Sequence, residues 1–189
     1  MTLKPEIDAG ALPARDAVVR QAQTAVIERM RQDPDAACST LVTTGRIEEG
    51  LTCHVAQGRF HATLDMGPGM GGDANGPSPG FFARAAIVGC VGIGVKMMAA
   101  REGLAFRSVD VGIECDFDDA ALMGLSARTA APLESRIRIE IDTDEDRATV
   151  RSLVDGALSQ DPWYLALRDA QIVHHEVHMI AAPQAIPAA

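Results

Sequence analysis

The sequence is poor in aromatic residues and carries no net positive charge. Phe, Trp and Tyr make up 4% of the 189 residues and 47% of the residues are hydrophobic, so we expect one domain with an aliphatic core. The formal net charge of −9 disfavours nucleic acids and anionic membranes as partners, because both are themselves negatively charged. The first ten residues contain no apolar run, and we therefore expect no signal peptide.

Cysteine is also sparse, and no C-x-x-C pair occurs. The four cysteines lie far apart in the sequence: Cys38, Cys53, Cys90 and Cys115. This spacing predicts neither a zinc site nor a disulfide framework, and it favours a cytoplasmic protein with reduced thiols and no metal or cofactor. An alternative metal site comprises His174, Glu176 and His178, which share one face of a predicted last strand. A solvated edge strand is the preferred interpretation.

The segment 67–103 dominates the sequence. A glycine-rich loop leads to Ser78-Pro79, a typical helix start, and Gly103 is a typical helix end. Apolar residues cover every side of the helix between them, which predicts a buried helix with Cys90 at its middle. A membrane span of this length is disfavoured by the charges at Arg84, Lys96 and Arg101. Three glycines in the helix indicate close approach by another element: Gly89, Gly92 and Gly94.

The remaining pattern predicts an α+β chain with mostly antiparallel strands. An amphipathic helix is expected at about 14–32, lying on the main body, with a partner-binding helix as the alternative. Strands are expected at 39–44, 51–55, 59–65, 108–117, 136–141 and 171–180. A further helix is expected after a cap at Thr143 or Asp144, and a short helical turn after Asp161-Pro162.

The sequence resembles the OsmC/Ohr family, the osmotically inducible protein C and organic hydroperoxide resistance proteins. The matching segments are Thr43 to Arg46 before a hairpin, Gly71 to Pro79 at the helix start, and Ala85 to Cys90 within the helix. The resemblance implies antiparallel sheets around the long central helix and an intertwined homodimer with two sites at its interface. It divides the chain into an N-terminal extension (1–35), an OsmC-like domain (36–183) and a tail (184–189).

The resemblance also implies roles for individual residues. In the peroxidase members a helix cysteine attacks the peroxide, a hairpin arginine stabilises its thiolate, and a glutamate positions that arginine. A second cysteine then forms a disulfide with the first. Matched residue by residue, Cys90 is the attacking cysteine and Arg46 the arginine, whereas Gly80 takes the place of the glutamate and Asp161 that of the second cysteine.

Two functions remain open at this point. The first is thiol-dependent reduction of organic hydroperoxides, with Cys90 as nucleophile, Arg46 as thiolate stabiliser and an external thiol in place of the second cysteine. Asp161 is a candidate catalytic acid, with a plain helix cap as the alternative. Cys115 is a poor substitute resolver, because its position in an alternating strand places it with buried valines. The second function is a non-peroxidatic scaffold that binds a small apolar ligand at the dimer interface.

Overall fold

Helices and antiparallel strands follow one another along residues 13–179, the part of the chain that this computed structural model describes. The elements are α1 (Ala14–Gln32), η1 (Pro34–Ala37), β1 (Thr44–Ile47), β2 (Cys53–Gln57), β3 (Phe60–Leu64), η2 (Pro68–Met70), α2 (Pro79–Glu102), β4 (Phe106–Asp116), α3 (Asp119–Leu122), β5 (Glu134–Thr143), α4 (Arg147–Leu158) and α5 (Pro162–Arg168). The predicted α+β class is confirmed.

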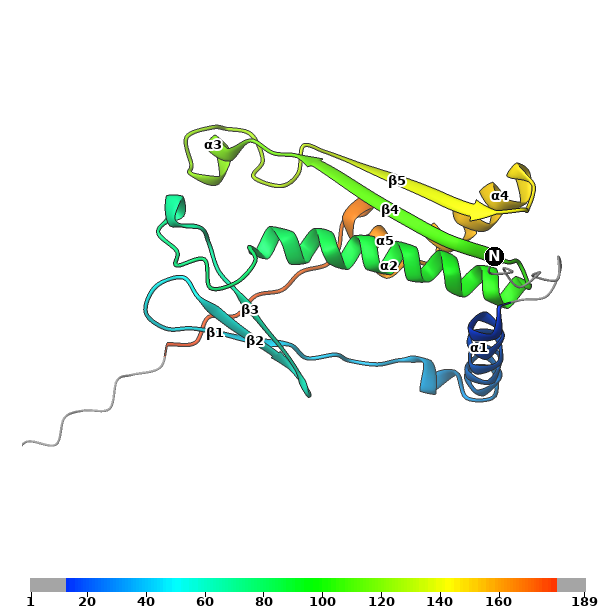
Figure 1. Cartoon of the computed structure of the whole chain (residues 1–189). Helices are drawn as coiled ribbons and strands as arrows, with labels where there is room; N and C mark the ends of the chain where they lie inside the picture. Colours follow the sequence, from blue (N-terminus) through cyan, green and yellow to red (C-terminus); the bar gives the residue numbers. More distant parts are fainter. Residues whose placement is uncertain (1–12, 180–189) are drawn as a thin grey trace, which may run out of the picture.

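Helix α2 runs through the middle of the molecule, and the other elements are arranged around it (Figure 1). The ribbon β4–β5 covers one side of α2, while α4 and α5 pack against the helix from another direction. The sheet β1–β2–β3 lies on the side of α2 opposite to the ribbon, and α1 crosses near the C-terminal end of α2. The described elements are therefore organised around this one helix.

Both sheets are antiparallel, as predicted. In the ribbon, Val109 pairs with Ile141 and Val111 with Ile139, which directs the apolar side chains to one face. The first strand was predicted at 39–44, and this position is wrong, because β1 begins only at Thr44. Thr44 pairs with Ala56, next to the end of β2, so the residues before Thr44 have no partner strand.

The buried core is concentrated at the C-terminal half of α2. Its members are Val95, Met98 and Ala99 of α2, Phe106 of β4, and Leu153 and Ala157 of α4. Elsewhere the helix is more open, since Phe81 is 50% and Ile93 is 62% exposed. The predicted burial on every side is therefore met, within one chain, only in part. By length and composition α2 could cross a membrane, a criterion that the core helix of a soluble protein also meets.

The N-terminal helix α1 has the predicted bounds, but a polar contact fixes it rather than an apolar stripe. Lys96 of α2 donates to Asp16 Oδ2 at 2.8 Å, and Asp16 is 8% exposed. By contrast, Val18 and Met30 on the same helix are exposed. A buried charge is stable only when it is paired, so this ion pair sets where α1 lies on α2.

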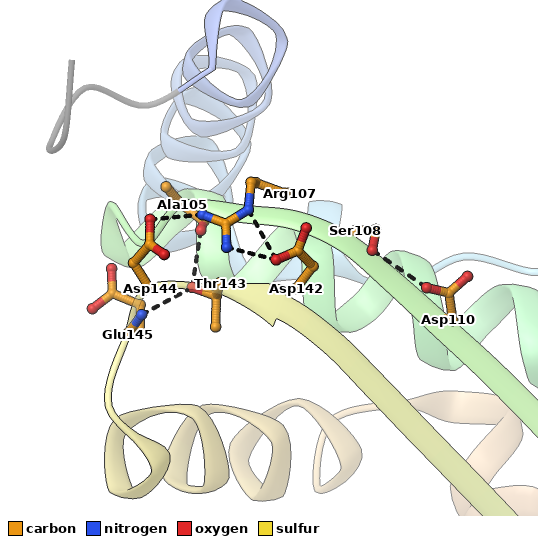
Figure 2. Close-up of polar contacts among 8 residues, drawn as sticks. All are labelled: Ala105, Arg107, Ser108, Asp110, Asp142, Thr143, Asp144 and Glu145. Carbon is orange, nitrogen blue, oxygen red and sulfur yellow. Dashed lines mark hydrogen bonds and ion pairs between the residues drawn. The ribbon is translucent and has the colours of Figure 1, made fainter. Parts of the chain in front are cut away.

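Polar contacts join the end of β5 to the start of β4 (Figure 2). Arg107 donates to Asp142 at 2.9 Å and to Asp144 at 2.6 Å. The hydrogen bond from Arg107 lowers the pKa of the Asp142 carboxyl. Asp142 and Asp144 are thus held at the open end of the ribbon and do not belong to a helix.

The predicted cap of α4 at Thr143 or Asp144 is wrong for this reason. Thr143 completes β5, and its hydroxyl donates to the carbonyl of Ala105 at 3.0 Å. The cap lies three residues later, at Asp146, whose carboxylate accepts from the N–H of Ala148 at 2.8 Å, and the helix begins at Arg147. By contrast, the predicted caps of α2 at Ser78 and Gly103 are confirmed.

The strand predicted at 171–180 is also wrong for the described residues, since 171–179 form no strand; Ile180 lies outside them. Alternating β-branched residues form a strand only where a neighbouring strand accepts their backbone hydrogen bonds. Within one chain this segment has none, and Ile172 and Val177 are 89% and 84% exposed.

The glycine-rich loop before α2 is folded tightly around one carboxylate. Asp65 is 2% exposed and accepts from the N–H groups of Met66 and Asn75 and from the Thr52 hydroxyl. These hydrogen bonds lower the pKa of the Asp65 carboxyl. The loop packs so closely on β3 that a Cβ at Gly76 would lie 2.2 Å from the nearest carbonyl oxygen. Close approach of the loop to β3 accounts for this glycine.

We expect Gly76→Ala to lower the free energy of unfolding by about 2 kcal/mol, because the backbone must move to admit the methyl group. Urea titration measures the change. Gly69→Ala, in the same loop, is the matched control, since no atom lies within 4 Å of a Cβ built there. Equal urea midpoints for the two variants would contradict this account of the loop.

Candidate functional site

Cys90 lies at the middle of α2, half-buried, in the wall of a cavity of about 300 Å³. The cavity opens between α2 and the turn that joins α4 to α5. Its lining residues are Cys90, Ile93, Gly94, Met97, Met98 and Arg101 of α2, and Ala157, Gln160, Asp161 and Pro162 of the facing segment. Most of this lining is apolar, and the thiol shares the cavity wall with one carboxylate.

Asp161 is that carboxylate, and it is 4% exposed. Its Oδ1 accepts from the N–H of Tyr164 at 2.7 Å, so the predicted cap of α5 is confirmed. No donor among the described residues meets hydrogen-bond geometry with its Oδ2. A Cβ at Gly94 would lie 3.4 Å from this oxygen, so a small residue there lets the carboxylate approach α2.

Burial and the nearby Asp161 carboxylate both change the pKa of the Cys90 thiol. Burial raises the pKa of the Cys90 thiol, and contact with the Asp161 carboxylate raises it further. The backbone N–H of Trp163 lowers the pKa, but its effect is smaller than that of burial. Because the pKa of the thiol is raised, the single chain holds Cys90 mainly as a neutral thiol near pH 7. Little of the reactive thiolate form is then present.

Arg46 is not at this cavity in the single chain. It lies exposed on β1 and forms an ion pair with Glu48 at 2.7 Å. Gly80, the position matched to the family's glutamate, is instead covered by an arginine: a Cβ there would lie 3.2 Å from Arg84 Nη1. Of the three predicted site residues, one chain therefore brings together Cys90 and Asp161 but not Arg46.

None of the other three cysteines lines the cavity, all of them lying within residues 13–179. Cys115 faces the inner side of β4, where its sulfur accepts from the Ser135 hydroxyl at 3.4 Å. A disulfide with Cys90 is therefore not prepared within one chain. Over the same range, no group of three His, Cys, Asp or Glu side chains could hold a metal ion, and His178 only contacts the exposed Glu176.

Sequence reasoning missed the other residues that line the cavity. Gly94, Met97 and Arg101 follow Cys90 at intervals of three or four residues, which places them on one face of a helix. That spacing was visible in the sequence. The contributions of Gln160 and Pro162 were not, because they depend on how the turn after α4 packs on α2.

The fold defines the class of protein: an α+β protein whose long central helix carries a free cysteine between a β-ribbon and a small antiparallel sheet. The sequence profile of the OsmC family, described as "OsmC-like protein", matches residues 71–176, which is more than half of the chain. The chain belongs to this family. The matched range includes Cys90 and Asp161 but not Arg46.

Solved structures of similar fold agree with this assignment. An OsmC-like protein from Mycoplasma pneumoniae has a TM-score of 0.59 and 15% identity, with 69% of this chain and 88% of that chain covered. A Psychrobacter arcticus protein, described in terms of osmotic stress and detoxification response, has a TM-score of 0.53 and 12% identity, with 68% and 89% covered.

A third structure, the organic hydroperoxide resistance protein OhrB of Bacillus subtilis, has a TM-score of 0.46 and 18% identity, with 69% of this chain and 91% of that chain covered. No curated protein shows significant sequence similarity to the chain. At these identities the structural likeness shows the fold alone.

We expect Asp161→Asn to lower the pKa of the Cys90 thiol, because the variant removes the negative charge and keeps the cap of α5. Alkylation by iodoacetamide should then rise with pH at lower pH values than in the unchanged protein. Mass spectrometry of the peptide that contains Cys90 measures the rate. Asp155→Asn, an exposed position on α4, should leave the profile unchanged; an identical shift in both variants would contradict the assignment.

Proposed function

We propose that this protein reduces organic hydroperoxides slowly, with Cys90 as the only cysteine of the cycle and an external thiol as reductant. The observation that carries the proposal is that Cys90 lines an open, mostly apolar cavity with Asp161 on its facing wall. The resemblance to the family matches Asp161 to the second cysteine of two-cysteine members. Apolar lining suits the organic part of a hydroperoxide. Membership of the OsmC family supports the same activity.

The proposed cycle needs two thiols for each hydroperoxide. The Cys90 thiolate attacks the O–O bond, which releases an alcohol and leaves a sulfenic acid on Cys90. An external thiol then forms a mixed disulfide with Cys90 and releases water. A second thiol restores Cys90. The rate-limiting feature is the small thiolate fraction, because burial and Asp161 both raise the pKa of the thiol.

Arg46 enters this proposal through a second copy of the chain. Sheet β1–β2–β3 carries Arg46, and every residue of β1 is exposed in the single chain. Exposed apolar residues also lie on α2 and in residues 171–179. A homodimer that covers these surfaces would bring charged and apolar groups of one copy toward the other. In it, Arg46 stabilises the Cys90 thiolate and offsets the opposing charge of Asp161.

The dimer gives a separate prediction. Light scattering after gel filtration should report twice the mass of one chain, and Ile93→Glu should shift the protein toward the monomer. Ile93 is 62% exposed on α2, and burying an unpaired carboxylate in an interface is strongly unfavourable. Leu125→Glu, at an 82% exposed site in the loop before β5, is the control. A monomeric mass for the unchanged protein would remove this part of the proposal.

A second candidate function is binding of a small apolar ligand without peroxide chemistry, at the dimer interface. The raised pKa of Cys90 favours it, because a neutral thiol is a poor nucleophile.

In either case, small molecules are the partners, and we propose a cytoplasmic location for a protein that needs reduced thiols. The division into an extension (1–35), an OsmC-like domain (36–183) and a tail (184–189) remains a proposal.

The two functions are separated by peroxide consumption. The reduced protein is mixed with cumene hydroperoxide and excess dithiothreitol, and the loss of peroxide is followed from pH 6 to 9. We expect a rate that increases with pH and falls by at least about tenfold in Cys90→Ser, since the thiolate is the nucleophile. Cys115→Ser should retain the rate. Equal rates for the unchanged protein and Cys90→Ser would leave only ligand binding.

A further inference from the structure

The proposed cycle gives no role to the buried oxygen Oδ2 of Asp161. A buried carboxylate without a full set of hydrogen bonds is costly, and Oδ2 of Asp161 has no partner among the described residues. This oxygen lies beside Gly94, and the Asp161 carboxylate contacts the Cys90 thiol in the wall of the cavity. Apart from the Cys90 thiol, which contacts this carboxylate, a donor to it would come from a molecule that enters the cavity next to the sulfur.

The charge of Asp161 also restricts which thiol can reduce Cys90. An external thiol attacks as a thiolate, so it brings a negative charge toward a sulfur that already touches a carboxylate. Two like charges about 4 Å apart at intermediate dielectric repel each other strongly enough to slow such an attack by well over tenfold.

Within one chain, no described residue that lines the cavity pairs with the Asp161 carboxylate to offset this repulsion. Arg101 is the cation in the described lining, and its Nη1 donates to Gln23 at 3.4 Å rather than to Asp161. A positive charge on the attacking thiol itself removes the penalty, because the ammonium pairs with the carboxylate while the sulfur attacks.

We propose that the cavity binds a small aminothiol, whose ammonium group pairs with Asp161 and whose sulfur reacts with Cys90. This inference rests on the proposed function and names the class of its reductant. A two-carbon link between nitrogen and sulfur suits the cavity, since the Asp161 carboxylate contacts the Cys90 thiol and both residues line its wall. In two-cysteine members the second cysteine provides the sulfur that reacts with the first. Here, Asp161 would bind the ammonium group of an aminothiol, whose sulfur takes that role.

The cycle balances with this reductant. The hydroperoxide takes two electrons from Cys90 and leaves as an alcohol, which gives the sulfenic acid. The aminothiol sulfur forms a bond to the Cys90 sulfur as the S–O bond breaks, and the oxygen leaves as water. A second aminothiol attacks the mixed disulfide, so the products are the aminothiol disulfide and the Cys90 thiol.

The test separates the reductant from the peroxide chemistry. Cys90 is first converted to a mixed disulfide with methyl methanethiosulfonate, which requires no hydroperoxide. Reduction is then timed with cysteamine, 2-mercaptoethanol and 3-mercaptopropionate, which are similar in size but carry a positive, neutral and negative group. Rates are expressed per thiolate, because the three thiols differ in acidity. The tryptic peptide 85–96 contains Cys90 as its single cysteine and reports this site alone.

We expect cysteamine to react at least about tenfold faster per thiolate than 3-mercaptopropionate, beyond the ratio found with a free model disulfide. Asp161→Asn should reduce the ratio to that of the model disulfide, and Asp155→Asn should keep it. If Asp161→Asn does not fold, Asp161→Ser, which also caps a helix, takes its place. A ratio that equals the model's in the unchanged protein, or that survives in the Asp161 variants, overturns the proposal.

The same experiment shows which proposal has failed. Cumene hydroperoxide is added separately, and sulfenic acid on peptide 85–96 is trapped with dimedone. No sulfenic acid together with a preserved cysteamine preference would remove the hydroperoxide function and leave an aminothiol site. Sulfenic acid without that preference would remove the aminothiol proposal and leave the hydroperoxide function.

Discussion

The contact between the start of α5 and the middle of α2 forms the wall of the candidate site and places a carboxylate beside its thiol. Asp161 caps α5 with one carboxylate oxygen and presents the other to α2, beside Cys90. Gly94 permits this approach, because a larger side chain would fill the space next to Oδ2. One residue therefore caps α5, lines the cavity and adds to the effect of burial in raising the pKa of the Cys90 thiol. Any change at Asp161 must be interpreted with all three effects in mind.

This arrangement reverses the electrostatics expected for an efficient thiol peroxidase. Reactive cysteines are usually accompanied by a cation or a helix N-terminus, which favours the thiolate. Cys90 lies in the middle of a helix, where the helix dipole has little effect on its pKa. The charged group that contacts its sulfur within the described chain is the Asp161 carboxylate. Within one chain the site thus suits a neutral thiol. Under the proposals made above, the missing positive charge comes from a second copy through Arg46 or from the reductant.

Much of the fold was predictable, because its signals are local. Ser78 and Gly103 define α2 through capping chemistry, and strict alternation defines β4 and β5. The failures depend on tertiary context. The cap of α4 shifted to Asp146 because Thr143 is used by the ribbon, and residues 171–179 form no strand because no neighbour is present. At the site, matching to the family placed Asp161 near Cys90, but no local pattern revealed that Oδ2 would lack a partner.

The open surfaces of the chain follow from the same limits. A core with few aromatic residues is concentrated at one end of α2, so it cannot also enclose the sheet β1–β2–β3 or the other half of the helix. Apolar surface left in water is unfavourable, and the proposed homodimer would bury it against an identical copy. Association would then complete the fold and bring Arg46 near the thiol in one step. In this view, the weak single-chain site and the exposed sheet have a common cause.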